Sequence, residues 1–171
     1  ELTCEQRVAL KGSLSRSIPS LSVITGLAGT GKTTIIKGIV RCLKSQRQDF
    51  VICSYTAKAK ERIIEVLGCD AFDICAGPDD VPKETCHVRT IHSTIAMLEK
   101  GELPTYVIID EATMVSLSLF AKLVRFFIKN YVSVIMLGDI NQLPSIKYGR
   151  CFEDIINSDR IDIYRLTRIL R

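Results

Sequence analysis

Tryptophan is absent from the sequence, and aromatic residues make up only 6% of its 171 positions. Because proteins often hold single-stranded nucleic acid by stacking bases on aromatic rings, we expect little base stacking here. No apolar run approaches the roughly 20 residues that span a bilayer, and residues 1–6 are too polar and acidic for a secretory signal peptide. We therefore expect an intracellular protein with no membrane partner.

No charge of one sign dominates the sequence. The formal net charge is +4, from 23 basic and 19 acidic residues. This balance permits contact with nucleic acid but does not by itself demonstrate it. The basic side chains of Lys58, Lys60, Arg62 and Arg89 fit a nucleic-acid surface and an ordinary solvated face equally well.

The seven cysteines lack the pattern of a disulfide framework. Their number is odd, and a chain of this size does not depend on disulfides for stability. We expect free thiols in a reducing compartment, with the nucleus, the cytoplasm and a viral factory left open. Cys69, Cys75, Cys86 and His87 are close enough in sequence for zinc, but they lack paired Cys-x-x-Cys spacing, so ordinary thiols are the favoured interpretation.

Short apolar runs alternate with segments of helical periodicity. The apolar runs predict buried strands at 21–25, 50–54, 106–110, 131–137 and 161–166. Segments with one apolar face predict helices at 2–14, 31–43, 57–67, 91–98 and 117–127. Residues 68–89 have no clear periodicity and predict a long loop or a small insertion.

This alternation predicts the fold class. Buried strands that alternate with helices form a parallel β-sheet with helices on both faces. The length is sufficient for one such α/β domain with a sizeable core. We therefore expect a single domain over residues 1–171.

The stretch "GLAGTGKTT" matches the phosphate loop G-x-x-x-x-G-K-[ST] and lies between a predicted strand and a predicted helix. Backbone N–H groups of such a loop and the helix amino end bind phosphate oxygens. Lys32 would reach the β- and γ-phosphates, and the Thr33 hydroxyl would bind Mg²⁺. A glycine-rich turn without a ligand is the alternative. The predicted nucleotide-binding residues are Gly26, Ala28, Gly29, Thr30, Gly31, Lys32, Thr33 and Thr34.

The stretch "YVIIDEA" places Asp110 and Glu111 at the end of an apolar strand. Ligands bind at this edge of open α/β sheets. Asp110 is then positioned to hold Mg²⁺ as a Walker B aspartate does, and Glu111 to polarise the attacking water. An exposed acidic pair at the start of a helix is the alternative interpretation. With the phosphate loop, the pair predicts hydrolysis of ATP or GTP with Mg²⁺.

The stretch "LGDINQLPSI" resembles the third motif of superfamily 1 helicases through Gly138-Asp139 and Gln142-Leu143-Pro144. The resemblance implies that Gln142 contacts the γ-phosphate, with Asp139 as its supporting carboxylate. A polar turn closed by Pro144 is the alternative.

Two terminal segments extend the resemblance. "LTCEQRVAL" resembles the family's amino-terminal glutamine motif, which implies that Gln6 reads the adenine edge, although Thr3 and Gln6 also have capping-box spacing. "RLTRILR" resembles the segment that holds the motif IV arginine. Arg171 matches by spacing, with Arg168 as the second choice, and this arginine would reach the γ-phosphate as charge develops.

Two internal segments imply contacts with the nucleic-acid strand. "SYTAKAKERI" resembles the motif Ia region and implies contacts by Thr56 and Lys58, although Ala57 stands where close relatives often have glycine. "RTIHSTI" resembles the Thr-x-His segment of the RecD-like branch, which implies that Thr90 and His92 lie near the bound strand. Alone, His92 would more often be a structural histidine.

Together these motifs identify the chain as resembling the RecD-like group of superfamily 1B helicases, over residues 2–171. The resemblance implies a RecA-like P-loop fold, ATP and Mg²⁺ as cofactors, and 5′-to-3′ movement on single-stranded DNA. The motifs of a second RecA-like domain are absent, so we expect the first domain only and slow hydrolysis. The short segment 93–105 is also brief for the strand-separating hairpin of close relatives. A P-loop kinase and an ATP-switched assembly module are the alternatives.

Overall fold

Six parallel strands form one sheet in the computed structural model, which describes residues 2–15, 19–68, 87–142 and 148–170. The strand order is β3-β2-β4-β5-β1-β6, and every neighbouring pair is parallel. The strands are β1 (Leu21–Gly26), β2 (Phe50–Ser54), β3 (His87–Thr90), β4 (Tyr106–Asp110), β5 (Ser133–Gly138) and β6 (Asp162–Leu166).

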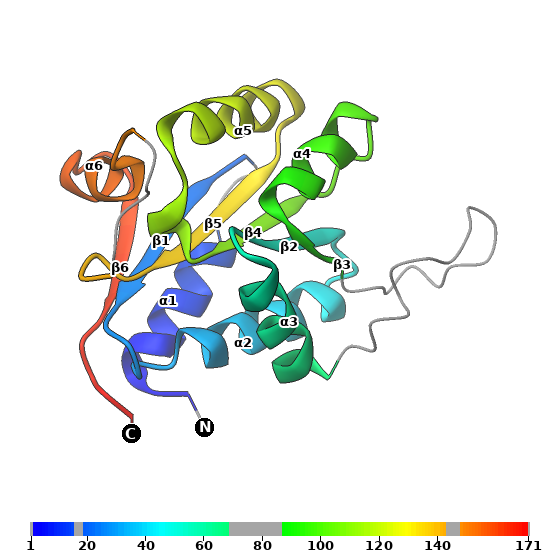
Figure 1. Cartoon of the computed structure of the whole chain (residues 1–171). Helices are drawn as coiled ribbons and strands as arrows, with labels where there is room; N and C mark the ends of the chain where they lie inside the picture. The colour runs from blue at the N-terminus through cyan, green and yellow to red at the C-terminus, as the bar shows by residue number, and fades with distance from the viewer. Residues whose placement is uncertain (1, 16–18, 69–86, 143–147, 171) are drawn as a thin grey trace.

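Helices cover both faces of this sheet, as Figure 1 shows. The first three helices lie on one face and the next three on the other (Figure 1). Their bounds are α1 (Cys4–Leu14), α2 (Lys32–Ser45), α3 (Ala57–Leu67), α4 (Ile91–Glu99), α5 (Leu117–Asn130) and α6 (Cys151–Asn157), with a short 3₁₀ turn η2 (Ala112–Met114).

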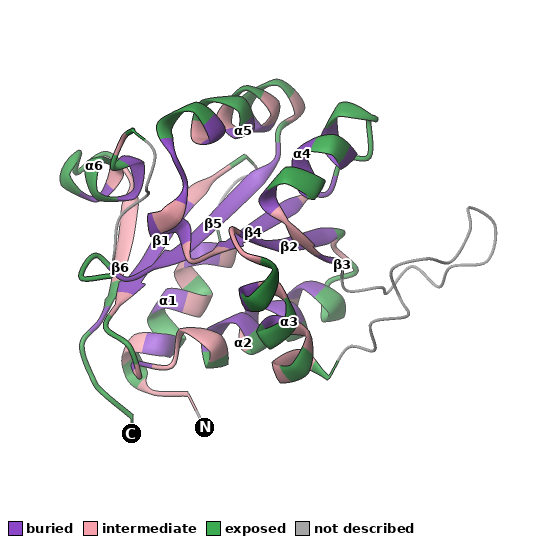
Figure 2. Cartoon of the chain, in the orientation of Figure 1, coloured by how far each residue is buried: buried purple, intermediate pink, exposed green. Residues whose placement is uncertain are grey.

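Alternate residues of the central strands enter two separate cores. In β4, Ile108 packs among residues of α2 and α3, whereas Val107 and Ile109 pack on the side of α4 and α5. Each of these side chains is fully buried, which contributes about 1.5–3 kcal/mol per side chain. Figure 2 shows the buried strands between helices with exposed outer faces. Continuous burial explains why the strands are apolar runs rather than alternating ones.

The predicted α/β class and parallel sheet are confirmed. The strands predicted at 50–54 and 106–110 and the helix predicted at 57–67 have the predicted bounds. Among the described residues, no helix is long and apolar enough to cross a bilayer. Of the predicted insertion at 68–89, residues 69–86 lie outside the described residues, as do three of the seven cysteines.

The structure differs from the predicted elements at three places. Residues 87–89 belong to the edge strand β3, which pairs only with β2 and is too short to produce a clear pattern. The strand predicted to start at Tyr131 starts at Ser133, because Tyr131 ends α5 in a left-handed conformation with φ of 57°. The helix α6 was not predicted, since its seven residues give less than two full turns of periodicity.

The described cysteines provide a test of this packing. Cys53 is fully buried in β2, and burial raises the pKa of its thiol to about 12 despite a hydrogen bond with Thr94. We expect iodoacetamide at pH 8 to modify the exposed Cys4 and to spare Cys53, whose thiolate fraction is about 1,000-fold below that of an ordinary thiol. Peptide mass spectrometry before and after unfolding measures labelling at both cysteines. Equal labelling of Cys4 and Cys53 in the folded chain would contradict the burial of Cys53.

Candidate nucleotide and nucleic-acid site

The candidate site lies at the edge where the parallel strands end. β1 ends at Gly26, β4 at Asp110 and β5 at Gly138, and β5 lies between the other two. The loops that follow these strands therefore meet at one edge of the sheet (Figure 1). Ligands of open α/β sheets bind at this edge.

The phosphate loop joins β1 to α2 through two positions that favour glycine. Gly29 and Gly31 have φ of 86° and 85°, a left-handed conformation that side chains disfavour. A Cβ atom at position 31 would also collide with the side-chain amide of Gln6. The hydroxyl of Thr30 donates to the carbonyl of Leu27 over 2.8 Å and closes the turn. The loop is therefore shaped immediately before the amino end of α2.

Lys32, the first residue of α2, extends its ammonium group back along this loop. Its Nζ donates to the carbonyls of Gly26 over 2.6 Å and Leu27 over 3.0 Å. Burial lowers the pKa of Lys32, whereas the carboxylates of Asp139 and Asp110 raise it. Both carboxylates therefore lie close enough to Lys32 to interact with it electrostatically.

The remaining predicted loop residues lie around the same turn. Thr33 is half-buried in the first turn of α2, and Ala28 and Thr34 are exposed. The N–H groups at the start of α2 and the helix dipole favour an anion at this position. The structure thus brings residues 26–34 together, and their contacts with a nucleotide stay predictions.

Asp110 and Glu111 occupy the end of β4. The Glu111 N–H donates to Oδ1 of Asp110 over 3.0 Å. Burial raises the pKa of Asp110, while this hydrogen bond lowers it. Glu111 has φ of 53°, a left-handed conformation that costs a non-glycine residue about 1–2 kcal/mol. This conformation turns the chain sharply after Asp110, and such strain is common at functional sites.

The residues after β5 form a compact turn beside this pair. Asp139 is buried, and its Oδ1 accepts a hydrogen bond from the Asn141 N–H over 3.0 Å. The Gln142 N–H donates to the Asp139 carbonyl over 2.9 Å, which leaves the Gln142 side chain exposed at the sheet edge. Leu143 and Pro144 lie outside the described residues.

Gln6 is buried and connects α1 to the phosphate loop. Its Oε1 accepts from the Thr3 N–H over 2.9 Å, and the Thr3 hydroxyl caps the helix in return, so the capping box is confirmed. Its Nε2 donates to the Thr30 carbonyl over 3.0 Å. Gln6 therefore both caps α1 and holds the loop, while its contact with adenine stays a prediction.

The segment after β6 runs along the other side of the phosphate loop. The Leu170 N–H donates to the Gly29 carbonyl over 2.9 Å. Glu5 of α1 accepts from the hydroxyl and the N–H of Thr167 over 2.5 and 2.8 Å. Arg168 is exposed beside this contact, and Arg171 lies outside the described residues. The segment predicted to hold the motif IV arginine is thus hydrogen-bonded to both α1 and the phosphate loop.

The predicted strand-contacting residues gather at the ends of β2 and β3. Ser54 and Thr90 are partners in the register of these neighbouring strands. The hydroxyls of Thr56 and Thr90 cap α3 and α4, over 3.1 and 3.3 Å, so each helix starts just after the end of its own strand. Lys58 and His92 are exposed in the first turns of these helices. Two helix amino ends and a lysine make this surface favourable for phosphate groups.

Three further side chains at this edge were not predicted. Glu5 was missed because its partner Thr167 lies 162 residues away. Tyr55 packs near His92, with 6.4 Å between the ring centroids, and its position beside Thr56 could have drawn attention to it. The Thr113 hydroxyl is buried in η2, and within the described ranges it has no hydrogen-bond partner.

The donor groups at this edge fit Mg²⁺ better than zinc. Among the described residues, no three His, Cys, Asp or Glu side chains gather as a metal site. Mg²⁺ is usually held by one or two carboxylates together with phosphate oxygens and water. The Thr33 hydroxyl and the Asp110 carboxylate are oxygen donors of that kind. The cysteines considered for zinc, Cys69, Cys75 and Cys86, lie outside the described residues.

Comparisons with known proteins agree with this fold. Residues 1–171 match the family described as an AAA domain. The chain is 27% identical over 169 residues to the RecBCD enzyme subunit RecD of Mycobacterium tuberculosis, covering 90% of this chain and 28% of that protein. RecD of Mycolicibacterium smegmatis is 28% identical over 172 residues, covering 89% of this chain and 30% of that protein.

A solved structure has a similar fold. The Pif1 helicase from Candida albicans matches with a TM-score of 0.67 and 23% identity, over 99% of this chain and 40% of that one. The chain therefore belongs to the AAA domain family, and its predicted resemblance to RecD-like superfamily 1B helicases is confirmed. It spans less than a third of the length of these RecD relatives.

The contact between Glu5 and Thr167 predicts a pH dependence of stability. The two hydrogen bonds from Thr167 hold the pKa of Glu5 below its ordinary value of 4.5. A lowered pKa stabilises the fold above the unfolded-state pKa, and this stability is lost as the pH falls through the folded-state value. We expect Glu5→Gln to reduce the loss of stability as the pH falls below the ordinary Glu5 value of 4.5, measured by urea unfolding.

Glu61→Gln is the matched control, because Glu61 is an exposed residue of α3. It should keep the pH dependence of the unmodified chain. An identical pH profile for Glu5→Gln and the unmodified chain would contradict a stabilising role for this contact.

Proposed function

We propose that the chain is the ATP-binding and hydrolysing motor domain of a 5′-to-3′ DNA helicase. The observation that carries the proposal is the convergence of the Lys32 ammonium with the carboxylates of Asp110 and Asp139 at one sheet edge. A phosphate loop, a Walker B aspartate and a third-motif aspartate are the parts that such a motor needs. Family membership and similarity to RecD support the proposal.

The nucleotide would bind with its phosphates in the loop 26–34. The backbone N–H groups at the start of α2 would bind phosphate oxygens, and Lys32 would turn from the loop carbonyls to the β- and γ-phosphates. Thr33 and Asp110 would hold Mg²⁺, which supplies charge neutralisation at the phosphates when bound. Burial of Lys32 strengthens this attraction, because charges interact more strongly away from water.

Three further residues would complete the chemistry. Glu111 would accept a proton from the attacking water, since it follows Asp110 directly at the end of β4. Gln142 would sense the γ-phosphate from the turn fixed by Asp139. Arg171, or Arg168 as the second choice, would stabilise developing charge on the phosphate. Glu5 would position this arginine segment by accepting two hydrogen bonds from Thr167.

The nucleic acid would lie across the ends of β2 and β3. Thr56 and Lys58 lie at the start of α3, and Thr90 and His92 lie at the start of α4, after these neighbouring strands. Contacts of this kind go to the phosphate backbone and carry little sequence preference. The resemblance to RecD-like helicases makes single-stranded DNA the proposed substrate, and a second RecA-like domain is the proposed partner that completes the ATP site.

Replacement of Glu111 tests the hydrolysis site. In a longer protein that contains both motor domains, we expect Glu111→Gln to keep ATP binding and to lower hydrolysis by about 10²–10⁴-fold, because the general base is lost. Lys32→Ala should instead weaken nucleotide binding itself. Phosphate release and binding of a fluorescent ATP analogue separate the two effects.

Glu99→Gln is the matched control, because Glu99 is the last residue of α4, at the end of the helix opposite to the strand ends. It should leave both measurements unchanged. Full ATP hydrolysis by Glu111→Gln would contradict the assignment of Glu111 as the general base. Transfer of phosphate to a nucleoside without a response to DNA would favour the kinase alternative.

Replacement of Lys58 tests the nucleic-acid surface. We expect Lys58→Ala to weaken binding of a labelled single-stranded oligonucleotide and to reduce the salt slope by about 1, because one phosphate contact is removed. Fluorescence anisotropy at several salt concentrations measures both quantities. Lys100→Ala is the control, since Lys100 is an exposed lysine at the opposite end of α4. Equal effects of the two substitutions would argue for non-specific charge attraction.

A further inference from the structure

The last residue of β5, Gly138, allows a buried aromatic ring to lie against the backbone of the sheet. A Cβ atom at this position would lie 2.7 Å from Cζ and 2.8 Å from Cε1 of Phe152, well inside the ordinary contact distance between carbon atoms. Phe152 is only 2% exposed and belongs to the core on the side of α4 and α5. The ring therefore has no open space to turn into, and it packs on the carboxyl end of β5.

The residue after this glycine belongs to the other side of the sheet. Successive residues of a strand point to opposite faces. Met136 belongs to the core that contains Phe152, whereas Leu137 belongs to the core on the side of α2 and α3. The glycine thus faces α6. Asp139 follows it, is buried, and lies close enough to the start of α2 for its carboxylate to interact with Lys32.

The helix that carries Phe152 is held at its amino end. The Leu117 N–H at the start of α5 donates to the carbonyl of Tyr148 over 3.1 Å. Gly149 has φ of 100°, and a Cβ atom there would lie 2.6 Å from Cβ of Leu117. These contacts attach the segment before α6 to α5. Because Phe152 is the second residue of α6, its ring is presented to β5 from a supported position.

The helix α6 also lies against the turn that follows β4. It contacts η2, and η2 in turn contacts β5. The first residue of η2, Ala112, follows Asp110 and Glu111 directly and shares a core with Phe152. One helix therefore supports the turns after β4 and after β5, which carry the two carboxylates near Lys32.

We propose that Phe152 is a positioning residue of the ATPase, and that its contact with Gly138 fixes the position of Asp139 relative to the phosphate loop. The Asn141 and Gln142 N–H groups both donate to Asp139, so a displaced Asp139 would move this turn with it. The inference rests on the proposed hydrolysis of ATP. It adds a residue that touches no nucleotide and acts through the backbone of β5.

Substitutions at both positions test this contact. Gly138→Ala should displace the end of β5, because its methyl group enters the space of the ring, and Gly138→Ala/Phe152→Leu should return that space. The readout is amide hydrogen exchange of Asn141 and Gln142, followed by NMR of the chain. We expect exchange to be about fivefold faster in Gly138→Ala and within about twofold of the unmodified chain in the double variant.

The kinetics of a longer protein with both motor domains show whether the contact matters for hydrolysis. We expect Gly138→Ala to lower kcat of the DNA-stimulated ATPase about tenfold and to change binding of a fluorescent ATP analogue by less than about twofold, because the phosphate loop is unaltered. The double variant should recover most of the lost kcat, since the end of β5 returns to its place.

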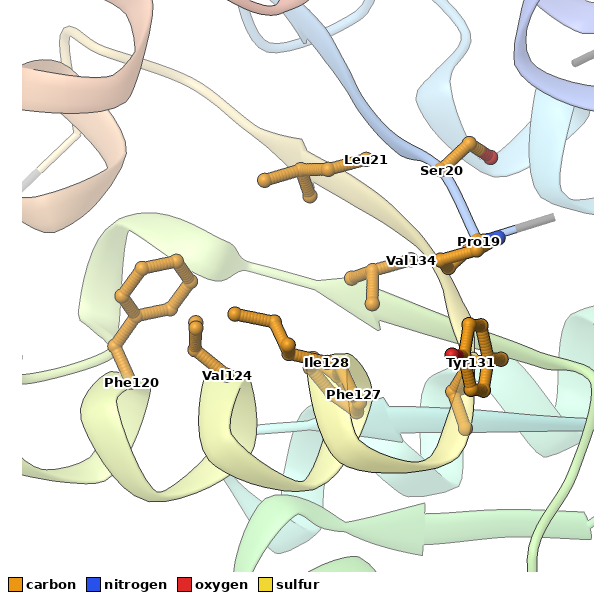
Figure 3. A pocket seen from close by; sticks show the side chains of 10 residues that line it. Pro19, Ser20, Leu21, Phe120, Val124, Phe127, Ile128, Tyr131 and Val134 are labelled. Carbon is orange, nitrogen blue, oxygen red and sulfur yellow. The ribbon is translucent and has the colours of Figure 1, made fainter. Parts of the chain in front are cut away.

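Phe127→Leu is the matched control for loss of a buried ring. Phe127 belongs to the same core as Phe152, but Figure 3 shows it on α5 among the residues that line a pocket with Val134, near the amino end of β5. Phe127→Leu and Phe152→Leu should both lower the Tm by a few degrees. Only Phe152→Leu should speed exchange at Asn141 and lower kcat, and this pair decides the question if Gly138→Ala does not fold.

Three outcomes would overturn the proposal. They are unchanged amide exchange in Gly138→Ala, a double variant no closer to the unmodified chain than Gly138→Ala, and faster exchange with an unchanged kcat. Absence of DNA-stimulated hydrolysis in the unmodified longer protein would instead contradict the proposed function. The exchange experiment would still decide whether Phe152 holds the Asp139 turn.

Discussion

The parallel direction of all six strands is the constraint on which the rest of the structure depends. It sends the carboxyl ends of β1, β4 and β5 to one edge, so side chains far apart in sequence gather there. Lys32, Asp110 and Asp139 meet because β5 lies between β1 and β4. The same constraint leaves the amino ends of the strands together at the opposite edge. Sheet direction therefore separates the edge that carries Lys32, Asp110 and Asp139 from the edge at which the strands begin.

The Lys32 ammonium shows how the polar edge is stabilised. Burial of an isolated ammonium would cost several kcal/mol, and here the carbonyls of Gly26 and Leu27 accept its hydrogen bonds while two carboxylates lie nearby. These groups stabilise the positive charge of Lys32 beside the loop. A polyphosphate offers oxygen acceptors of the same kind with more negative charge, so the arrangement that stabilises the loop also suits it for nucleotide.

Local sequence patterns predicted the residues of the candidate site better than the surrounding elements and contacts that hold them in place. The phosphate loop and the end of β4 were readable because each motif is continuous in sequence and follows a buried strand. The edge strand β3 was missed because four residues on a sheet edge give no periodic pattern. Tyr131 was assigned to a strand because its aromatic ring fits strand propensity, whereas helix termination determines its conformation. The contact of Glu5 with Thr167 depends on chain closure over 162 residues, which no local pattern contains.

Residues with a left-handed backbone at the two edges of the sheet have different surroundings. At the carboxyl edge, strained or left-handed residues such as Glu111 and Gly31 shape polar loops whose hydrogen bonds are made within the chain. At the amino edge, Tyr131 has a similar conformation, but its side chain is apolar and 69% exposed. The left-handed turn at Glu111 therefore shapes the candidate site, whereas the left-handed conformation of Tyr131 ends α5.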